Sequence, residues 1–263
     1  NHRDRMSKAA MDINREVEAL LASRPDTFEG NKGFTLSEKY LLSQYSGAGG
    51  KAAAGARGQG LLYEYYTPMW LCEKMWELAL HYGESPRHVL EPAAGTGNLL
   101  ALMPDSVEAA MAFELNRTAA RIARIRAPKA TVLTLPFEAA FLEPPRFTNR
   151  SRVTWLGHAP YDLVIGNPPY GVHTGVKAAL FRKPDLKTFE VFFLYWGLEV
   201  LRDGGLLVMV IPSSFLRSDE RYAKQKALLE KRCDLVDAYR LPKVFDSTTI
   251  GTDIVVLRKK SKR

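Results

Sequence analysis

The sequence predicts a doubly wound α/β fold, with a mostly parallel sheet of seven strands and a helical extension at the amino end. Two observations carry this prediction. From residue 88 onward, short apolar runs alternate with segments of helical periodicity, which is typical of a parallel sheet with helices on both faces. Several of these runs, residues 161–165 above all, are almost entirely apolar, as expected of strands covered on both faces.

The first 60 residues differ from the rest. Residues 1 to about 45 are expected to be helical, with an interruption at 23–26. The apolar residues with helical spacing are Met11, Ile13, Val17, Leu20 and Leu21. Residues 46–60, SGAGGKAAAGARGQG, predict a mobile loop or linker, although their glycines also suit a backbone that approaches a phosphate. We therefore expect an appended extension and linker over residues 1–60 and the main domain over 61–263.

The expected elements of the main domain follow one another as strand, turn and helix. Strands are predicted at residues 88–91, 109–114, 130–135, 161–165, 206–211, 235–239 and 253–257. Helices are predicted at residues 99–103, 117–126, 187–201 and 218–232. Because α/β sheets bind ligands beyond the carboxyl ends of their strands, the turns that follow these strands are the places to look for a site.

Composition narrows the class of protein. No apolar run approaches the roughly 20 residues that a membrane span needs, so a cytoplasmic globular protein without a membrane partner is expected. Cys72 and Cys233 lie far apart and outside any metal-binding pattern, so neither a disulfide framework nor a metal site is indicated.

Charge alone decides little about partners. The net charge is +8, but residues 258–263 carry +5 of it. This basic end suits either a DNA contact or a solvated terminus. Arg117, Arg121 and Arg124 fall on one face of a predicted helix, where they suit either solvent or the phosphates of DNA.

The first chemically informative segment is Glu-Pro-Ala-Ala-Gly-Thr-Gly-Asn at residues 91–98, between a strand and a helix. Gly95 and Gly97 let the backbone turn sharply and approach a ligand, whose anionic group can sit at the next helix N-terminus. The third glycine of the dinucleotide fingerprint is missing, and no Lys-Ser/Thr pair follows as in a P-loop. The turn therefore indicates a nucleotide-like cofactor, or it is only structural.

Glu114 strengthens the cofactor interpretation. It lies 19 positions after Gly95, at the end of the next predicted strand. An acidic side chain at this place accepts hydrogen bonds from ribose hydroxyls. The alternative is that Glu114 only caps the helix that follows.

The second informative segment is Asn167-Pro168-Pro169-Tyr170, directly after the apolar fourth strand. Each proline holds the residue before it in extended geometry, so Asn167 stays at the carboxyl edge of the sheet. The side-chain oxygen of Asn167 and the main-chain oxygen of Pro168 can both accept hydrogen bonds from one amino group, and this leaves electron density on its nitrogen. Tyr170 can stack on the planar group that carries the amine.

With these segments in this order, residues 65–260 resemble the gamma class of adenine-specific amino DNA methyltransferases, with their Asn-Pro-Pro-Tyr motif and their Rossmann-like class I fold. The resemblance makes 61–263 an S-adenosylmethionine-dependent methyltransferase domain. It implies that Asn167, Pro168, Pro169 and Tyr170 are catalytic. The implied cofactor-binding residues are Thr67, Glu91, Pro92, Ala93, Gly95, Gly97 and Glu114.

Further roles follow from the same resemblance. Phe193 is the expected neighbour of the cofactor's adenine, and Phe245 is expected to sandwich the target base with Tyr170. The family usually has an aspartate before a phenylalanine after the third strand, to hold the cofactor's adenine amino group. This chain has Leu-Pro-Phe-Glu at residues 135–138 instead, so Phe137 and Glu138 or main-chain atoms are expected to take that place.

The expected function is transfer of a methyl group from S-adenosylmethionine to N6 of an adenine flipped out of double-stranded DNA, directly and without a metal. Two alternatives stay open: a methyltransferase that acts on RNA or a protein glutamine, and a non-catalytic DNA-binding subunit with the same fold. The chain ends soon after its last predicted strand. DNA recognition is therefore expected from the first 60 residues, from a specificity subunit or from a recognition domain outside this sequence.

Overall fold

The computed structural model describes residues 7–47, 66–83, 85–142, 159–171, 186, 188–217, 220–244 and 250–261. The strands are β1 (His88–Glu91), β2 (Ala109–Phe113), β3 (Ala130–Leu133), β4 (Tyr161–Gly166), β5 (Leu201–Pro212), β6 (Cys233–Arg240) and β7 (Thr252–Lys259). The helices are α1 (Lys8–Ala22), α2 (Leu36–Ser43), α3 (Met69–Tyr82), α4 (Asn98–Ala101), α5 (Arg117–Arg126), α6 (Ala139–Leu142), α9 (Phe189–Val200) and α10 (Ala223–Glu230), with a 3-10 turn η1 (Glu220–Tyr222).

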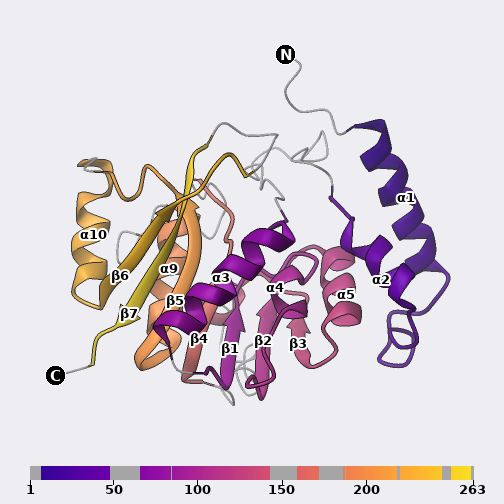
Figure 1. The fold of residues 1–263 in the computed structure, drawn as a ribbon, viewed down its shortest axis with the longest axis horizontal. Coiled ribbons are helices and arrows are strands. Elements are labelled where there is room, and N and C mark those ends of the chain that lie inside the picture. Colours follow the sequence, from indigo (N-terminus) through magenta and orange to yellow (C-terminus); the bar gives the residue numbers. More distant parts are fainter. Residues whose placement is uncertain are drawn as a thin grey trace.

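The seven strands form one sheet in the order β3-β2-β1-β4-β5-β7-β6 (Figure 1). The first five are parallel to one another, and β7 runs antiparallel to both β5 and β6. This confirms the predicted mostly parallel doubly wound sheet. The order reverses between β1 and β4, so the carboxyl ends of these two neighbouring strands border a crevice in which α/β folds bind ligands.

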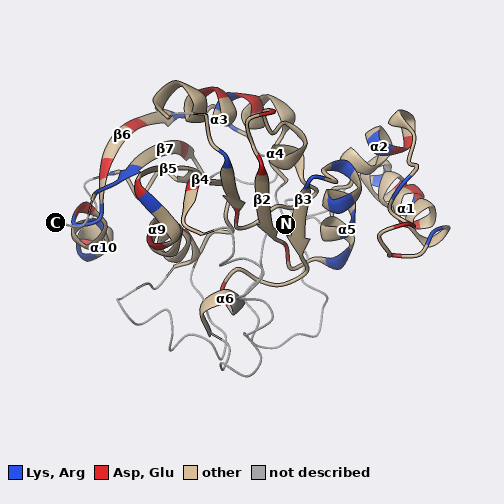
Figure 2. Ribbon diagram, turned by 90° about the horizontal axis from the view of Figure 1, so that it is seen from below, with Lys and Arg blue, Asp and Glu red and all other residues tan. Residues whose placement is uncertain are grey.

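Alternate residues of the central strands pack into two hydrophobic cores, one on each face of the sheet. Val89, Leu163 and Val208 pack under α3, whereas Leu90, Val164 and Leu207 pack against α9. Alanines of β2 and α5 make a third cluster with Leu100 of α4 on the α3 side. Helices thus cover both faces of the sheet (Figure 2), which explains why its central strands are apolar at successive positions.

Several element bounds differ from prediction. Strand β3 ends at Leu133 rather than at 135, and α4 covers residues 98–101 rather than 99–103. The predicted helix 187–201 is α9, but Leu201 already begins β5. The predicted helix 218–232 is shorter, because a 3-10 turn precedes α10 and β6 begins at Cys233. No helix among the described residues is both long and apolar enough to cross a membrane.

The amino-terminal helices pack against α5, so the expected appendage is joined to the sheet domain. Val17, Leu21 and Leu42 form one buried cluster with Ile122 and Ile125. Helix α2 begins with a complete capping box, in which Thr35 and Glu38 bond each other's backbone N–H. Residues 7–45 therefore hold two helices, and the interruption predicted at 23–26 extends over residues 23–35.

The arginine face of α5 is wrongly predicted. Arg121 is buried and donates to the backbone oxygens of Leu21 and Arg24, each at 2.7 Å. Arg124 is paired with Asp26 at 3.1 Å, and of the three arginines Arg117 is the exposed one. Figure 2 shows the basic segments of α5 beside α1 and α2. Two of the three arginines therefore fasten the extension and are not available to DNA.

Replacing Arg121 tests this attachment. Arg121→Ala is expected to lower the free energy of unfolding by about 2 to 4 kcal/mol, because buried carbonyl groups lose a charged donor. The measurement is chemical denaturation followed by circular dichroism. Arg117→Ala is the matched control on the same helix and should change stability by less than about 0.5 kcal/mol. Equal effects of the two substitutions would contradict the attachment.

Candidate active site

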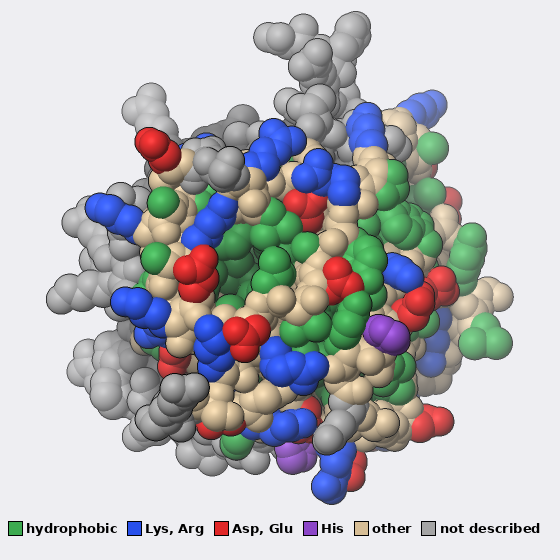
Figure 3. Space-filling view, turned by 60° about the vertical axis from the view of Figure 1, so that its left-hand side comes forward, with side chains coloured by type: hydrophobic (Ala, Val, Ile, Leu, Met, Phe, Trp, Pro, Cys, Tyr) green, Lys and Arg blue, Asp and Glu red, His purple; other side chains and the backbone are tan. Residues whose placement is uncertain are grey.

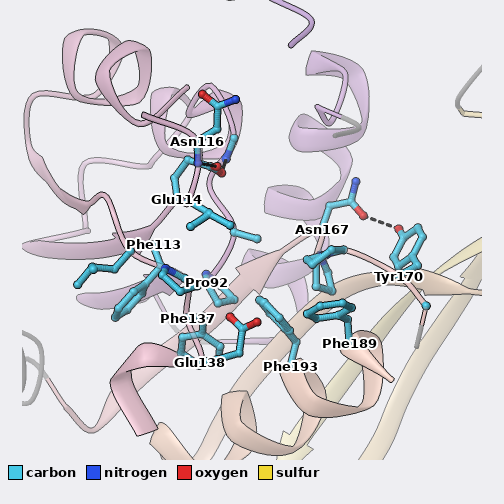
Figure 4. A pocket seen from close by; sticks show the side chains of 18 of the residues that line it. Pro92, Phe113, Glu114, Asn116, Phe137, Glu138, Asn167, Tyr170, Phe189 and Phe193 are labelled. Atoms are coloured by element: carbon cyan, nitrogen blue, oxygen red, sulfur yellow. Dashed lines mark hydrogen bonds between the residues drawn. The ribbon is translucent and has the colours of Figure 1, made fainter. Parts of the chain in front are cut away.

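A pocket of about 370 Å³ opens at the carboxyl ends of the strands on either side of the crossover (Figure 4). Its wall includes residues that the sequence singled out on four separate segments. They are Pro92, Ala93 and Gly95, then Glu114, then Phe137 and Glu138, and then Asn167 to Tyr170. Phe193 of α9 also lines the pocket. The volume falls in the range of small-molecule sites, about 300 to 1,000 Å³.

The glycine turn depends on two left-handed residues. Gly95 and Gly97 have φ values of +55° and +76°. A Cβ on Gly97 would lie 2.9 Å from Ala123 of α5, so this glycine serves the packing of α5 against the turn. Gly97 lines neither the pocket nor the recess beside it, in contrast to Gly95. Its cofactor contact stays a prediction, and the structure gives it a role in bringing α5 close to the turn.

Glu114 closes the turn from the neighbouring strand. One oxygen of its carboxylate accepts the backbone N–H of Gly95 and the other accepts that of Asn116, both at 2.7 Å. The side chain that caps α5 belongs to Asn116, which accepts from Ala119 N at 3.1 Å. The helix-cap alternative for Glu114 is therefore wrong, and its carboxylate fixes the position of the glycine turn while lining the pocket.

A small polar recess adjoins the pocket. Thr67, Glu91, Asn98 and Asn167 line it. Asn98 holds the segment before α3 in place, because its amide donates to Thr67 O at 2.7 Å. Glu91 is buried, and its Oε2 has no hydrogen-bond partner among the described residues. Burial, reinforced by the charge of Glu114, raises the pKa of the Glu91 carboxyl well above its usual range.

The Asn167 amide is held at both ends. Its Nδ2 donates to Thr67 Oγ1 at 3.2 Å, and its Oδ1 accepts from the hydroxyl of Tyr170. Burial raises the pKa of Tyr170, so this hydroxyl stays protonated and remains a donor. These bonds set the orientation of the amide, with the oxygen on the Tyr170 side (Figure 4). An amide oxygen has two lone pairs, so Asn167 Oδ1 keeps one acceptor position for a further donor.

Tyr170 has contacts that the sequence did not predict. Its hydroxyl also donates to Val210 O at 3.3 Å, and its ring packs against the core cluster under α3. Stacking on a planar substrate stays a prediction for this ring. Phe245, the other predicted base contact, lies outside the described residues.

The far end of the pocket is aromatic. Phe137 is buried against Phe113 and Phe193, with ring centroids 5.5 and 5.3 Å away. Glu138 is nearly buried beside them and lines the same pocket. Figure 4 shows its carboxylate near Phe137 and Phe193, facing the cavity. An acidic side chain thus stands beside the aromatic end of the pocket, directly after the phenylalanine before which the resemblance expects an aspartate.

The resemblance includes Tyr66 in the element Tyr66-Thr67-Pro68 that is expected to touch the cofactor, but it does not predict that the Tyr66 ring faces the glycine turn. Tyr66 lines the pocket, and its ring lies so close to Gly95 that a Cβ there would be 2.7 Å from it. Tyr45, just after α2, stacks behind Tyr66 with ring centroids 6.2 Å apart. The doublet Tyr65-Tyr66 before Thr67 was the available signal, but its partner lies 21 positions away.

Among the described residues, no group of three or more His, Cys, Asp and Glu side chains is placed to hold a metal ion. The polar groups around the pocket are amides, hydroxyls and carboxylates that face it singly. This donor set suits hydrogen bonding to an organic ligand.

Comparison with known proteins finds a family that part of the chain resembles. Residues 132–245 match the Eco57I restriction-modification methylase family, and the matched segment includes Asn167 to Tyr170. Over 86% of its own length, the chain is 27% identical to the defense against restriction protein B of Escherichia phage P1. The match covers only 9% of that phage protein. Over 89% of its own length, the chain is 22% identical to the type I restriction enzyme MpnII methylase subunit of Mycoplasma pneumoniae, and the match covers 46% of that subunit.

Among solved structures, a class I S-adenosylmethionine-dependent methyltransferase from Listeria monocytogenes superposes with a TM-score of 0.67 at 18% identity. The superposition covers 99% of this chain and 83% of the other. The chain therefore has the class I methyltransferase fold, and its residues 132–245 are similar to the Eco57I restriction-modification methylases.

Proposed function

We propose that the chain binds S-adenosylmethionine and transfers its methyl group to the exocyclic N6 amino group of adenine in DNA. One observation carries the proposal: Asn167 lines the same pocket as the glycine turn and Glu114. An acceptor suited to an amine thus stands across one cavity from a turn suited to a nucleotide-like cofactor.

The residues around the pocket fit this cofactor. Glu91 offers an unpartnered carboxylate oxygen in the polar recess, which suits the cofactor's ammonium group. Glu114 lines the neighbouring wall and suits ribose hydroxyls, and Phe193 with Glu138 suits an adenine ring that has an amino group. When bound, the cofactor supplies an electrophilic methyl group on a sulfonium.

The target amine would be held by Asn167 and Pro168. The free lone pair of Asn167 Oδ1 and the Pro168 carbonyl oxygen accept its two hydrogens, so its nitrogen keeps its electron pair for attack. Such preorganised polar contacts contribute about 3 to 4 kcal/mol to lowering a barrier. A paired and stacked adenine cannot reach this position, so the base must first leave the duplex, at a cost of a few kcal/mol. Tyr170 and Phe245 are the aromatic residues that we propose to contact the flipped base.

The matched family and the names of the relatives support DNA as the substrate. The Mycoplasma relative is described as a methylase subunit of a restriction enzyme. We propose that recognition of the DNA sequence comes from a specificity subunit or from a recognition domain beyond the segment described here. The competing substrates are RNA and protein glutamine, because the same tetrapeptide suits other planar amides and amines.

A direct assay separates these substrates. The chain, with S-adenosylmethionine labelled in its methyl group, is incubated in parallel with DNA, RNA and protein. Label is expected in DNA, and digestion to nucleosides should give N6-methyladenine. Label in RNA or protein alone would overturn the proposed substrate. Failure to bind the cofactor by calorimetry would favour a non-catalytic subunit.

Asn167→Ala is expected to keep cofactor binding and to lower the methylation rate at least about 100-fold, because an oriented acceptor is lost. Asn167→Asp is the matched variant: it keeps an acceptor oxygen and should retain far more activity. Single-turnover methylation and calorimetry are the two measurements. Near-normal turnover of the alanine variant would remove Asn167 from this role.

Tyr170→Phe separates hydrogen bonding from stacking. We expect about a tenfold lower single-turnover rate, because one hydrogen bond to Asn167 is lost while the ring remains. Tyr170→Ala should also raise the KM for DNA, because a stacking surface is worth about 1 to 3 kcal/mol per base. A phenylalanine variant as fast as the wild type would show that the hydroxyl does not orient Asn167.

Glu91→Gln tests the buried carboxylate. Because the pKa of Glu91 is raised in the fold, the folded protein favours the neutral acid. The free energy of unfolding therefore falls as pH rises through that pKa, because the buried carboxyl must then lose its proton. The glutamine variant should therefore melt at a higher temperature than wild type at alkaline pH, with a smaller difference at acidic pH.

The same variant should bind S-adenosylmethionine more weakly, because the ammonium loses its anionic partner. In the wild type, cofactor binding should release protons, which calorimetry in buffers of different ionisation enthalpy measures. Unchanged cofactor affinity in Glu91→Gln would exclude the ammonium contact.

A further inference from the structure

A polar cluster at the catalytic edge of the sheet has no part in the chemistry proposed above. It consists of Ser213 after β5, Asp253 in β7 and Arg240 at the end of β6. Asp253 Oδ1 accepts from Ser213 Oγ at 2.8 Å and from Arg240 Nε. The cluster is close to the pocket along the chain, because Ile250 lines the pocket and lies three residues before Asp253.

The two ends of the Arg240–Asp253 pair differ sharply in exposure. The side chain of Asp253 is 3% exposed, whereas that of Arg240 is 58% exposed. A buried carboxylate needs its counter-charge, so Asp253 holds the Nε side of the guanidinium in place. The two Nη groups of Arg240 make no hydrogen bond to the described part of the chain. A fixed pair of charged donors therefore faces outward.

The surroundings of Arg240 are also basic. Arg217, which follows β5, and Lys243, which follows β6, are exposed on the same edge of the sheet. Figure 3 shows the side of the molecule that carries β6 and α10, where Lys and Arg side chains, together with Asp and Glu side chains, lie around an apolar hollow. Strand β6 is three strands from β4 in the sheet order, which corresponds to roughly 14 Å between Arg240 and the catalytic turn.

We propose that Arg240 binds a backbone phosphate of the DNA strand that carries the target base. The inference rests on the proposed function, because it takes DNA as the substrate. An arginine fork matches phosphate oxygens in geometry, and one whose Nε is already fixed loses less side-chain entropy on binding. The contact carries no sequence information; it fixes the register of the DNA across the pocket.

Arg202 offers a matched control. Its Nε donates to Asp162 Oδ1 at 2.7 Å, and its side chain is 41% exposed. This pair has the same chemistry and its arginine is likewise partly exposed, although its carboxylate is less buried, at 21% exposed. It stands at the amino ends of β4 and β5, on the opposite edge of the sheet. Arg202→Gln removes one exposed positive charge, as Arg240→Gln does, and so controls for net charge.

The test is DNA affinity against salt, measured by fluorescence anisotropy with a labelled duplex of arbitrary sequence between 50 and 200 mM salt. Loss of one phosphate contact lowers the slope of log affinity against log salt by about 0.9. The affinity advantage of wild type over Arg240→Gln should therefore shrink about 3.5-fold across this range. Arg202→Gln should keep the wild-type slope, and an equal change in both variants overturns the proposal.

Removing Arg240 leaves Asp253 buried without its counter-charge, so a second comparison guards against misfolding. Asp253→Asn is compared with Asp253→Asn/Arg240→Gln, two proteins that differ only at residue 240. The same loss of slope is expected between them.

The outcomes separate the two proposals. If wild type methylates DNA but the slope is unchanged without Arg240, the phosphate contact alone is overturned. If wild type neither binds nor methylates DNA, the proposed function fails, and the phosphate contact fails with it.

Discussion

The carboxylate of Glu114 is the constraint on which the pocket depends. Its two oxygens hold the N–H groups of Gly95 and Asn116, so one side chain joins the end of β2, the turn after β1 and the start of α5. Backbone N–H groups in a left-handed turn have no acceptor within a strand or helix, and an anion can accept their hydrogen bonds instead. Because the same carboxylate lines the cavity, the turn and the ligand-facing wall take their positions from one residue.

The sheet and the turns that line the pocket were predictable because local patterns determine them. Apolar runs set the strands, and Gly95, Gly97 and the two prolines set turns whose geometry needs those residue types. Strand order then brought the predicted segments to one edge. Asn167 lines the predicted pocket for this reason, although it is 72 residues from Gly95.

Contacts between distant segments were not predictable in the same way. Arg121 falls on a polar helix face, and periodicity cannot show that the carbonyl groups of Leu21 and Arg24, about 100 positions earlier, cover it. The hydrogen bond from Tyr170 to Asn167 is local, but the sequence fits an outward-facing ring equally well. The roles of Glu138 and Phe245 stay predictions, because they concern contacts with ligands.

The contact between Tyr45 and Tyr66 has a consequence for how this fold can be divided. Tyr66 forms a wall of the cavity beside Gly95, and Tyr45 supports it from the amino-terminal helices. Those helices are themselves fastened to α5, which packs on the glycine turn through Gly97. A truncation to residues 61–263, the predicted main domain, would leave every predicted site residue in the chain and yet remove Tyr45, the support of one cavity wall. The part of the chain that holds the cavity in shape is therefore larger than the segment its motifs delimit.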